Sequence, residues 1–320
     1  MRYDISVVLA TFNRAKDLHR TLEGMAKTRK GGMTVGFVVV DNGSTDRTRA
    51  VVQSFSGRMP IQYIYEARSG KNRALNTALE KAELADIVVF TDDDVDVPAG
   101  WLTAIRSVCN RWPDHSVFGG RIDVVFPNAE VPKWAFDPDI SSFAFARHNY
   151  SRKECVYGKG ETPFGPNLWV RRSIFDGNRR FNEAIGPRPG NRIMGSETSF
   201  LVGLLNEGYE IVYSPAVAVG HRIQPEALKW QTVCTRAYRL GRSVPYIHGL
   251  PQASLLGSYP ALWRMYRYSA IAWNASRVLS SALFSRKEKR LVNCARSIRN
   301  IGYHRESMRF RIPYYRDDRC

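Results

Sequence analysis

Short apolar runs separated by helix-like patterns fill the first 125 residues. The apolar runs predict strands, and they cover residues 5–10, 35–40, 61–65 and 87–91. Apolar residues recur at helical spacing over 15–27 and 72–82, and Pro98 stands where a further helix is expected to begin. Alternating strands and helices favour parallel pairing with right-handed crossovers. This part of the chain is therefore expected to form a doubly wound, mostly parallel α/β sheet.

The pattern changes after this region. Residues 127–165 carry several prolines and many aromatic residues, helical spacing returns over 197–207, and 210–219 predicts a pair of late strands. The last hundred residues are rich in Arg and Tyr, and their pattern is mostly helical. We therefore expect an α/β domain over residues 1–222 and a basic helical extension over 223–320.

The positive charge of the chain is concentrated at its C-terminal end. The whole chain has a net charge of +17. Residues 1–220 hold 28 Lys and Arg against 25 Asp and Glu, a net +3, whereas residues 221–320 hold 19 against 5, a net +14. This asymmetry indicates an anionic partner for the C-terminal part, such as a membrane surface, a lipid phosphate or a nucleic acid.

An amphipathic segment lies within the basic part, over residues 269–284. One helix face of it carries Ile271, Ala275, Val278, Leu279, Ala282 and Leu283. The segment contains Arg277 and has only 16 residues, fewer than the roughly 20 that cross a bilayer. It is expected to lie in a membrane interface, flanked by Arg264, Arg267, Arg286, Lys287, Lys289 and Arg290. The alternative is a helix packed on the first domain with its basic face in water.

The cysteines and the first residues bear on the compartment. Five cysteines are scattered without a CxxC spacing, which argues against a disulfide framework or a zinc site and favours a reducing compartment. The chain opens without a basic segment followed by a long apolar run, so no signal peptide is expected. The expected location is the cytoplasm, either free or attached peripherally to the inner face of the cell membrane.

Polar and charged residues follow each of the four predicted strands. They are Thr11 and Asn13 after the first strand, Asp41 and Asp46 after the second, Arg68, Gly70 and Lys71 after the third, and Asp92, Asp93 and Asp94 after the fourth. Sites in open α/β sheets lie beyond the carboxyl ends of the strands. These residues are therefore expected to converge on one rim and to line a single pocket. Ser44 or Thr45 is expected to cap the helix after the second strand.

The strongest local signal is TDDDVDVP, residues 91–98. Adjacent carboxylates repel one another unless a cation neutralises them. Oxygen ligands suit Mg²⁺ or Mn²⁺, ions that also bind diphosphates. The motif therefore predicts a divalent-cation site, and the alternative is a solvated acidic turn.

Seven segments occur in an order typical of one enzyme family. They are SVVLATFNRA (6–15), VVVDNGSTD (38–46), SGKNRALNTAL (69–79), VVFTDDDVDVPAGWL (88–102), GPNLWVRRSIF (165–175), GSETSFLVGLLNEGY (195–209) and VAVGH (217–221). Together they resemble a family 2 glycosyltransferase of the GT-A fold, a family of inverting enzymes that make polysaccharides and glycolipids. The resemblance spans about residues 1–222. It implies metal-assisted transfer of a sugar from a nucleotide-sugar donor to an acceptor hydroxyl, with Mn²⁺ or Mg²⁺ as cofactor.

The resemblance implies roles for residues on the rim. Thr11 and Asn13 would line the nucleotide pocket, and Asp41 would hold the base or the ribose. Arg68 and Lys71 would lie against the nucleotide or its diphosphate, since cations pair with phosphate. On residue chemistry alone, Asp41 also suits a turn, and the two cations also suit a solvated loop.

The acidic motif and two later residues complete the implied donor site. Asp92 or Asp93 would contact the ribose, and Asp94 would ligate the metal. Asn167, in the GPN segment, would bind donor or acceptor. His221 would ligate the metal together with the third aspartate, while a structural role is the alternative for an isolated His.

Glu197 is implied as the catalytic base. Family members usually carry two adjacent acidic residues here, whereas this chain has Ser196 followed by Glu197. Inversion in one displacement needs a base that accepts the proton of the acceptor hydroxyl. Glu197 matches the second acidic position. The structural alternative is a Glu that stabilises a helix start through the helix dipole.

Two other functions use features that this chain has. A sugar-phosphate nucleotidyltransferase combines an α/β sheet with metal-binding aspartates, but it typically carries a Gly-rich loop after the first strand, and LATFNRA has no glycine. A nucleic-acid-binding protein would account for the net charge of +17, but no nucleic-acid-binding motif is present. The expected partners are a UDP-, GDP- or dTDP-linked donor and a glycan or lipid-linked acceptor, with no nucleic acid.

Overall fold

The computed structural model describes residues 3–128, 130–186, 193–249, 260–284 and 287–309. The chain divides into two compact units. The first unit comprises residues 1–129, 145–192 and 196–224, and the second comprises residues 130–144, 193–195 and 225–320. The second unit therefore takes in two short segments from earlier in the chain.

A mixed sheet of nine strands, counted within the described residues, forms the centre of the first unit. The strands are β1 (Ile5–Thr11), β2 (Val35–Asp41), β3 (Ile61–Tyr65), β4 (Ile87–Thr91), β5 (Val95–Asp96), β6 (Val117–Val125), β7 (Cys155–Val156), β8 (Leu168–Arg171) and β9 (Ile211–Arg222). Their order is β3-β2-β1-β4-β8-β6-β9-β5, and β7 pairs with β9. The pairs β1–β2, β1–β4, β2–β3 and β6–β9 are parallel. The predicted α/β class with a mostly parallel sheet is confirmed.

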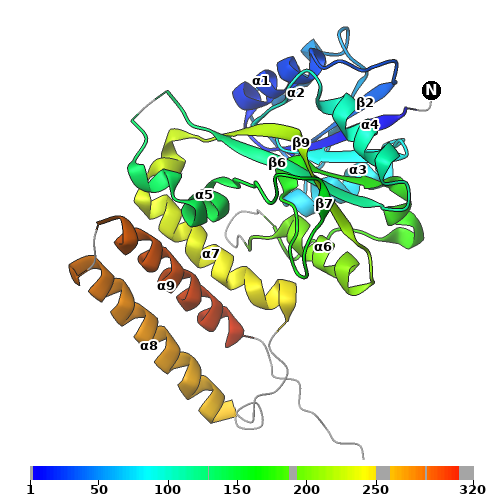
Figure 1. The fold of residues 1–320 in the computed structure, drawn as a ribbon. Coiled ribbons are helices and arrows are strands. Elements are labelled where there is room, and N and C mark those ends of the chain that lie inside the picture. The colour runs from blue at the N-terminus through cyan, green and yellow to red at the C-terminus, as the bar shows by residue number, and fades with distance from the viewer. Residues whose placement is uncertain (1–2, 129, 187–192, 250–259, 285–286, 310–320) are drawn as a thin grey trace, which may run out of the picture. The chain divides into compact units, whose positions relative to one another are not determined.

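Helices cover both faces of this sheet (Figure 1). Those on one face are α1 (Ala15–Ala26), α2 (Thr48–Ser54) and α4 (Trp101–Arg111); α3 (Lys71–Lys81) and α6 (Ser196–Asn206) lie on the other, and η2 (Gly165–Asn167) and η3 (Arg172–Asn178) flank β8. Strand residues alternate between the two cores, so that Val7 packs in the first and Val8 in the second. Because both faces are buried, the parallel strands appear in the sequence as continuous apolar runs.

Several strands were not visible in the hydrophobic pattern. β5 and β8 have only two and four residues, and β6 contains two glycines. Residues 210–219, expected as a pair of strands, lie mostly in the single strand β9. The register between β9 and β6 shifts between Gly120 and Arg121, which is why the long strand looks interrupted in the sequence.

Two helix starts also differ from the prediction. α2 begins at Thr48, whose N–H donates to Asp46 Oδ1 at 3.0 Å. The cap position is held by Arg47, without a side-chain cap hydrogen bond, rather than by Ser44 or Thr45. α4 begins at Trp101 rather than at Pro98, and the Pro98 carbonyl accepts the Trp101 N–H. In both cases a turn separates the capping signal from the helix.

The carboxyl ends of the parallel strands meet at one edge of the sheet. β1, β2, β3 and β4 run in the same direction and end there. β8 is antiparallel to both β4 and β6, and β6 is parallel to β9, so β9 also runs toward this edge. His221, next to the end of β9, therefore reaches the same rim as the acidic residues that follow β4.

The second unit is helical, as expected for the C-terminal part. Its elements are η1 (Lys133–Phe136), most of α5 (Pro138–Phe145), η4 (Pro225–Leu228), α7 (Trp230–His248), α8 (Pro260–Phe284) and α9 (Lys287–Ser307). α9 packs against both α7 and α8 (Figure 1). α7 and α9 approach so closely at Gly241 and Gly302 that only glycine fits at either position. A Cβ on Gly241 would lie 1.8 Å, and one on Gly302 2.2 Å, from a carbonyl oxygen of the other helix. In the part of the chain that the structure describes, no helix has both the length and the apolar character to span a membrane.

Candidate active site

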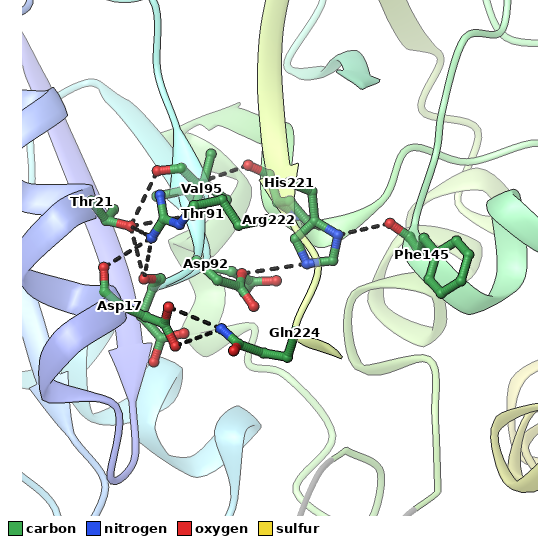
Figure 2. A network of polar contacts seen from close by, with 12 residues as sticks. Asp17, Thr21, Thr91, Asp92, Val95, Phe145, His221, Arg222 and Gln224 are labelled. Atoms are coloured by element: carbon green, nitrogen blue, oxygen red, sulfur yellow. Dashed lines mark hydrogen bonds and ion pairs between the residues drawn. The ribbon is translucent and has the colours of Figure 1, made fainter. Parts of the chain in front are cut away.

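His221 and Asp94 face each other at the rim of the sheet. His221 Nε2 lies 3.4 Å from Asp94 Oδ1, and His221 Nδ1 lies 2.7 Å from the carbonyl oxygen of Phe145 (Figure 2). Because a carbonyl only accepts, Nδ1 carries the hydrogen and donates it. Asp94 Oδ1 is buried and has no hydrogen-bond partner. The pair thus presents a carboxylate oxygen and an imidazole nitrogen to the same small space.

Arg14 neutralises the aspartates from the other side. Its Nη1 lies 2.9 Å from Asp94 Oδ2 and 3.4 Å from Asp93 Oδ1, and its Nε donates to Asp17. No role for Arg14 was predicted, although it directly follows Asn13 in the first family-like segment. The guanidinium supplies the cation that adjacent carboxylates need.

The pKa values of Asp93 and Asp94 are shifted in opposite directions. Burial raises the pKa of Asp93 to about 7, against the lowering effect of Arg14. Burial also acts to raise the pKa of Asp94, but His221 and Arg14 outweigh it and hold that pKa well below its ordinary value. Thr11 Oγ1 donates to Asp93 Oδ2 at 2.6 Å. Asp94 is therefore the carboxylate that stays charged when the two compete.

Lys71 joins Asp92 to Glu197. Its Nζ lies 2.6 Å from Asp92 Oδ1 and 2.6 Å from Glu197 Oε1. Burial of the ammonium acts to lower the pKa of Lys71, but the two carboxylates outweigh this effect and raise it. The first turn of α6 is thereby tied to the acidic turn after β4, although about a hundred residues separate them in the chain. The lysine stays charged between two anions.

Gly165 makes room for the Glu197 carboxylate. A Cβ at Gly165 would lie 2.4 Å from Glu197 Oε1, so any larger residue would displace the carboxylate. Gly165 opens the GPN segment, whose importance was expected from the sequence. The structure thus assigns this segment a close approach to the predicted base.

Asp41 and Asn13 organise the loops after β1 and β2. Asp41 Oδ1 accepts the Ser44 N–H at 2.8 Å and Oδ2 accepts the Tyr63 hydroxyl at 2.8 Å. Asn13 has a φ of 52° and its Oδ1 accepts the Thr45 N–H at 2.7 Å. Both side chains lie at the rim, and both are used in building turns.

Two of the predicted site residues make contacts away from the acidic turn. Arg68 is 66% exposed and forms a two-point ion pair with Glu66, at 2.9 Å for each nitrogen. Asn167 is fully buried. Its Oδ1 accepts from Trp101 Nε1, and its Nδ2 donates to the carbonyls of Arg121 and Val217. The amide of Asn167 therefore holds β6, β9 and α4 together.

Arg222 is a second residue without a predicted role. It directly follows His221 and is 6% exposed. Its N–H donates to the Asp94 carbonyl at 2.9 Å, and its Nη2 donates to Thr21 Oγ1 at 2.8 Å (Figure 2). The Thr21 hydroxyl in turn donates to the Asp93 carbonyl. β9 therefore fixes the backbone of the acidic turn from behind.

A profile of the family described as "Glycosyl transferase family 2" matches residues 6–178, which is more than half of the chain. The chain belongs to glycosyltransferase family 2. This membership favours sugar transfer over the nucleotidyltransferase interpretation.

Relatives extend the similarity beyond the family profile. Glycosyltransferase AglE of Haloferax volcanii is 26% identical over 266 residues, covering 81% of this chain and 79% of the relative. The succinoglycan biosynthesis protein ExoM of Rhizobium meliloti is 27% identical over 264 residues, covering 78% of each chain. The similarity therefore reaches into the C-terminal half of this glycosyltransferase.

Solved structures share the fold. The mannosyltransferase PcManGT of Pyrobaculum calidifontis, determined with GDP-Man and Mn²⁺, aligns with a TM-score of 0.60 at 16% identity, covering 96% of this chain and 87% of that chain. GalNAc-T7, determined with UDP, GalNAc and Mn²⁺, aligns with a TM-score of 0.53 at 14% identity, covering 79% and 52%. The fold of this glycosyltransferase is GT-A.

Asp94 and His221 carry groups of the kind that ligate metal ions in proteins. Among the described residues, no cluster of three or more His, Cys, Asp or Glu side chains is suited to hold a metal ion. Asp94 Oδ1 and His221 Nε2 nevertheless suit one: the oxygen is buried without a hydrogen-bond partner, and the imidazole is oriented by a backbone carbonyl, as metal-ligating histidines usually are. Two protein ligands leave room for a bound substrate to supply others.

Proposed function

We propose that this glycosyltransferase moves a sugar from a nucleoside-diphosphate sugar to an acceptor hydroxyl, with inversion at the anomeric carbon. The observation that carries the proposal is the Lys71 bridge, 2.6 Å from both Asp92 and Glu197. It brings a carboxylate from α6 beside the acidic turn after β4. A base next to a diphosphate-binding rim is the arrangement that a single displacement needs.

The donor is proposed to lie along the carboxyl ends of β1 to β4. Thr11, Asn13 and Asp41 would line the nucleotide pocket, and Asp92 or Asp93 would accept hydrogen bonds from the ribose. The solved structures of PcManGT with GDP-Man and of GalNAc-T7 with UDP support a nucleotide-linked donor. In this proposal Arg68 would have to leave Glu66 to reach a phosphate, and Asn167 would act by supporting the site from the core.

A divalent cation, Mn²⁺ or Mg²⁺, is proposed to bind between Asp94 and His221. The buried Asp94 Oδ1 and the oriented His221 Nε2 support this assignment. Mn²⁺ in the solved structures of PcManGT and GalNAc-T7 supports it as well. When bound, the ion would stabilise negative charge on the leaving diphosphate.

Glu197 is proposed as the base. Its carboxylate would accept the proton of the acceptor hydroxyl as that oxygen attacks the anomeric carbon from the face opposite the diphosphate. Lys71 would hold the orientation of the carboxylate, while Gly165 leaves space for it. The relative named for succinoglycan biosynthesis supports a glycan or a lipid-linked saccharide as acceptor.

Two measurements test the proposal. A thermal-shift series with UDP, GDP and dTDP, each with and without Mn²⁺, should reveal one nucleotide that stabilises the protein in a metal-dependent way. Glu197→Gln should keep this stabilisation and lose transfer by about 10²–10⁴-fold, the loss typical of a missing general base. Transfer by Glu197→Gln at the parental rate would show that the base lies elsewhere.

A further inference from the structure

The exposed face of α8 is apolar. Ten large hydrophobic residues are exposed in the described part of the chain, and six of them lie on this one helix. They are Leu262 (46% exposed), Met265 (64%), Tyr266 (49%), Tyr268 (61%), Trp273 (65%) and Leu279 (66%). Such a concentration on a single helix face marks a surface that binds something.

The face of α8 that packs against α9 carries two buried polar side chains. Arg267 is 2% exposed and Asn274 is 6% exposed. The Arg267 guanidinium lies 3.8 Å from the centre of the Trp263 ring, and its Nη1 lies 2.9 Å from His304 Nδ1 on α9. Asn274 Oδ1 accepts from Asn300 Nδ2 at 3.2 Å. The helix therefore buries Arg267 and Asn274 while several of its largest apolar side chains stay exposed.

The exposed large apolar side chains distinguish α8 from a helix that packs in water. A surface helix normally turns its apolar stripe to the core and its charges to the solvent. Here the side chains opposite Arg267 and Asn274, at 100° per residue, are uncharged. They are Leu262, Met265, Ser269, Ala272, Ser276, Leu279 and Ser280. The outward face is thus suited to an apolar environment.

Positive charge surrounds this apolar face. Arg264 and Arg277 are exposed and lie on its two sides. Between residues 260 and 309, eleven Lys and Arg stand against two Glu, a net charge of +9. An apolar stripe with aromatic residues, bordered by cations, matches the interface of an anionic bilayer, where acyl chains lie below phosphate groups.

We propose that the outward face of α8 inserts into the interface of a membrane that contains anionic phospholipids, with the helix axis parallel to the surface. Trp273, Leu279 and Met265 would enter the acyl boundary, and Arg264 and Arg277 would pair with lipid phosphates. The face differs in part from the one expected from the sequence. Of the residues predicted to face the lipid, Leu279 is exposed, whereas Ile271, Ala275 and Val278 are partly buried. The side chains of Ala282 and Leu283 lie outside the part that the structure describes.

The charge distribution favours lipid over the other occupants. A nucleic acid would meet apolar side chains where it needs cations along the contact surface. A second copy of this chain would bring its own arginines against Arg264 and Arg277 around the apolar stripe, and like charges repel. An anionic bilayer satisfies both the apolar centre and the basic border.

Vesicle flotation with the full chain tests the proposal without donor or metal. We expect binding to phosphatidylcholine vesicles that contain phosphatidylglycerol, and at least tenfold weaker binding to pure phosphatidylcholine or in high salt. Trp273→Ser with Leu279→Ser should reduce binding to anionic vesicles by roughly tenfold or more, because two apolar anchors are lost. The matched control is Tyr65→Ser with Phe136→Ser, which removes apolar residues that are 53% and 58% exposed outside α8. The control should bind like the parent.

The basic border is tested in the same assay. Arg264→Gln with Arg277→Gln should reduce binding about tenfold, whereas Arg47→Gln with Arg172→Gln, a matched pair of exposed arginines in the first unit, should not. Equal melting temperatures would show that the variants fold. Equal loss in test and control pairs would overturn the proposal. Absence of vesicle binding would also overturn the proposal. Binding of duplex DNA in place of vesicles would indicate a nucleic-acid partner, and a dimer that dissociates in Trp273→Ser with Leu279→Ser would indicate a second copy of the chain.

Discussion

Lys71 Nζ contacts Glu197 Oε1 at 2.6 Å and Asp92 Oδ1 at the same distance. One cation thus holds the proposed base and the first residue of the acidic turn in fixed positions. Replacing either carboxylate would change the position of the other, because the ammonium would remain with a single partner. The contact makes Lys71 a positioning residue for both halves of the proposed reaction.

Replacing Lys71 should displace Asp92 and Glu197 from each other. In Lys71→Met, Asp92 and Glu197 lose their common counterion and repel one another, so we expect transfer to fall by about 10²-fold. Lys71→Arg keeps the charge and should retain more of the activity. Steady-state kinetics on the two variants measure the effect, and equal rates for Lys71→Met and the parent would contradict the assigned role.

Arg14 should compete with a divalent cation. Its guanidinium lies 2.9 Å from Asp94, so Arg14→Gln leaves a more negative pocket that holds Mn²⁺ more tightly. We expect Mn²⁺ to raise the melting temperature of Arg14→Gln by about 2–4 °C more than that of the parent. Arg20→Gln, which removes an exposed partner of Asp96, is the control. The same metal-induced shift in both variants would show that Arg14 does not compete.

Gly165→Ala should impair transfer and spare donor binding. The new methyl group would lie 2.4 Å from Glu197 Oε1 and would displace the carboxylate from the acceptor. A misplacement of this kind costs about 10²-fold in rate. Calorimetry with the stabilising nucleoside diphosphate should give a dissociation constant within about twofold of the parent. Gly57→Ala, at a position with no atom within 4 Å, should behave like the parent in both measurements.

Asn167→Ala should destabilise the protein. The substitution leaves the buried Trp101 Nε1 and the carbonyls of Arg121 and Val217 without their partner. We expect a loss of about 2–3 kcal/mol in the free energy of unfolding. Urea unfolding measures it, and nucleotide affinity of the folded variant should stay near the parental value. A large loss of affinity at unchanged stability would instead support direct substrate contact.

His148 should make stability depend on pH. It is 8% exposed and its Nε2 lies 2.7 Å from the Tyr157 hydroxyl, and burial lowers the pKa of His148 from 6.5 to about 4. Below pH 6.5, His148 is protonated in the unfolded chain but stays neutral in the folded chain. The free energy of unfolding therefore decreases as the pH falls toward 4.

Between pH 7 and pH 5 this effect amounts to about 2 kcal/mol. The parent should therefore lose about that much more stability over this interval than His148→Gln, which keeps a hydrogen-bonding partner for Tyr157. Urea unfolding at the two pH values measures the difference. Parallel pH dependence of parent and variant would place the proton uptake elsewhere.

The sequence predicted the parallel strands because burial on both faces leaves a continuous apolar run, as in β1 and β2. It did not predict β6, whose paired Gly119 and Gly120 lack apolar side chains. Gly120 is required because a Cβ there would lie 2.2 Å from the Val217 carbonyl oxygen. Close packing between distant segments leaves no periodic pattern in the sequence.

The site was only partly visible for the same reason. Carboxylates at strand ends indicated the rim, and Asp92, Asp93, Asp94, Lys71 and His221 do gather there. Arg14 and Arg222 were missed, since a lone arginine carries no signal of its partner until the chain is folded. The exposed face of α8 was predicted only in part: Leu279 is exposed, whereas Ile271 and Val278 are partly buried. Helical periodicity identifies apolar stripes and does not say which stripe meets a neighbouring helix.

Arg222 also determines when the site is completed during synthesis. The Arg222 N–H donates to the Asp94 carbonyl in the acidic turn, and His221 directly precedes Arg222 in the chain. Both residues lie beyond residue 178, where the match to the family profile ends. A nascent chain that already contains every aspartate of the rim would still lack the strand that supports the turn. The ribosome must therefore deliver more than two-thirds of the 320 residues before the pocket has its final shape. An incomplete polypeptide would bear the acidic motif without the geometry that makes it selective.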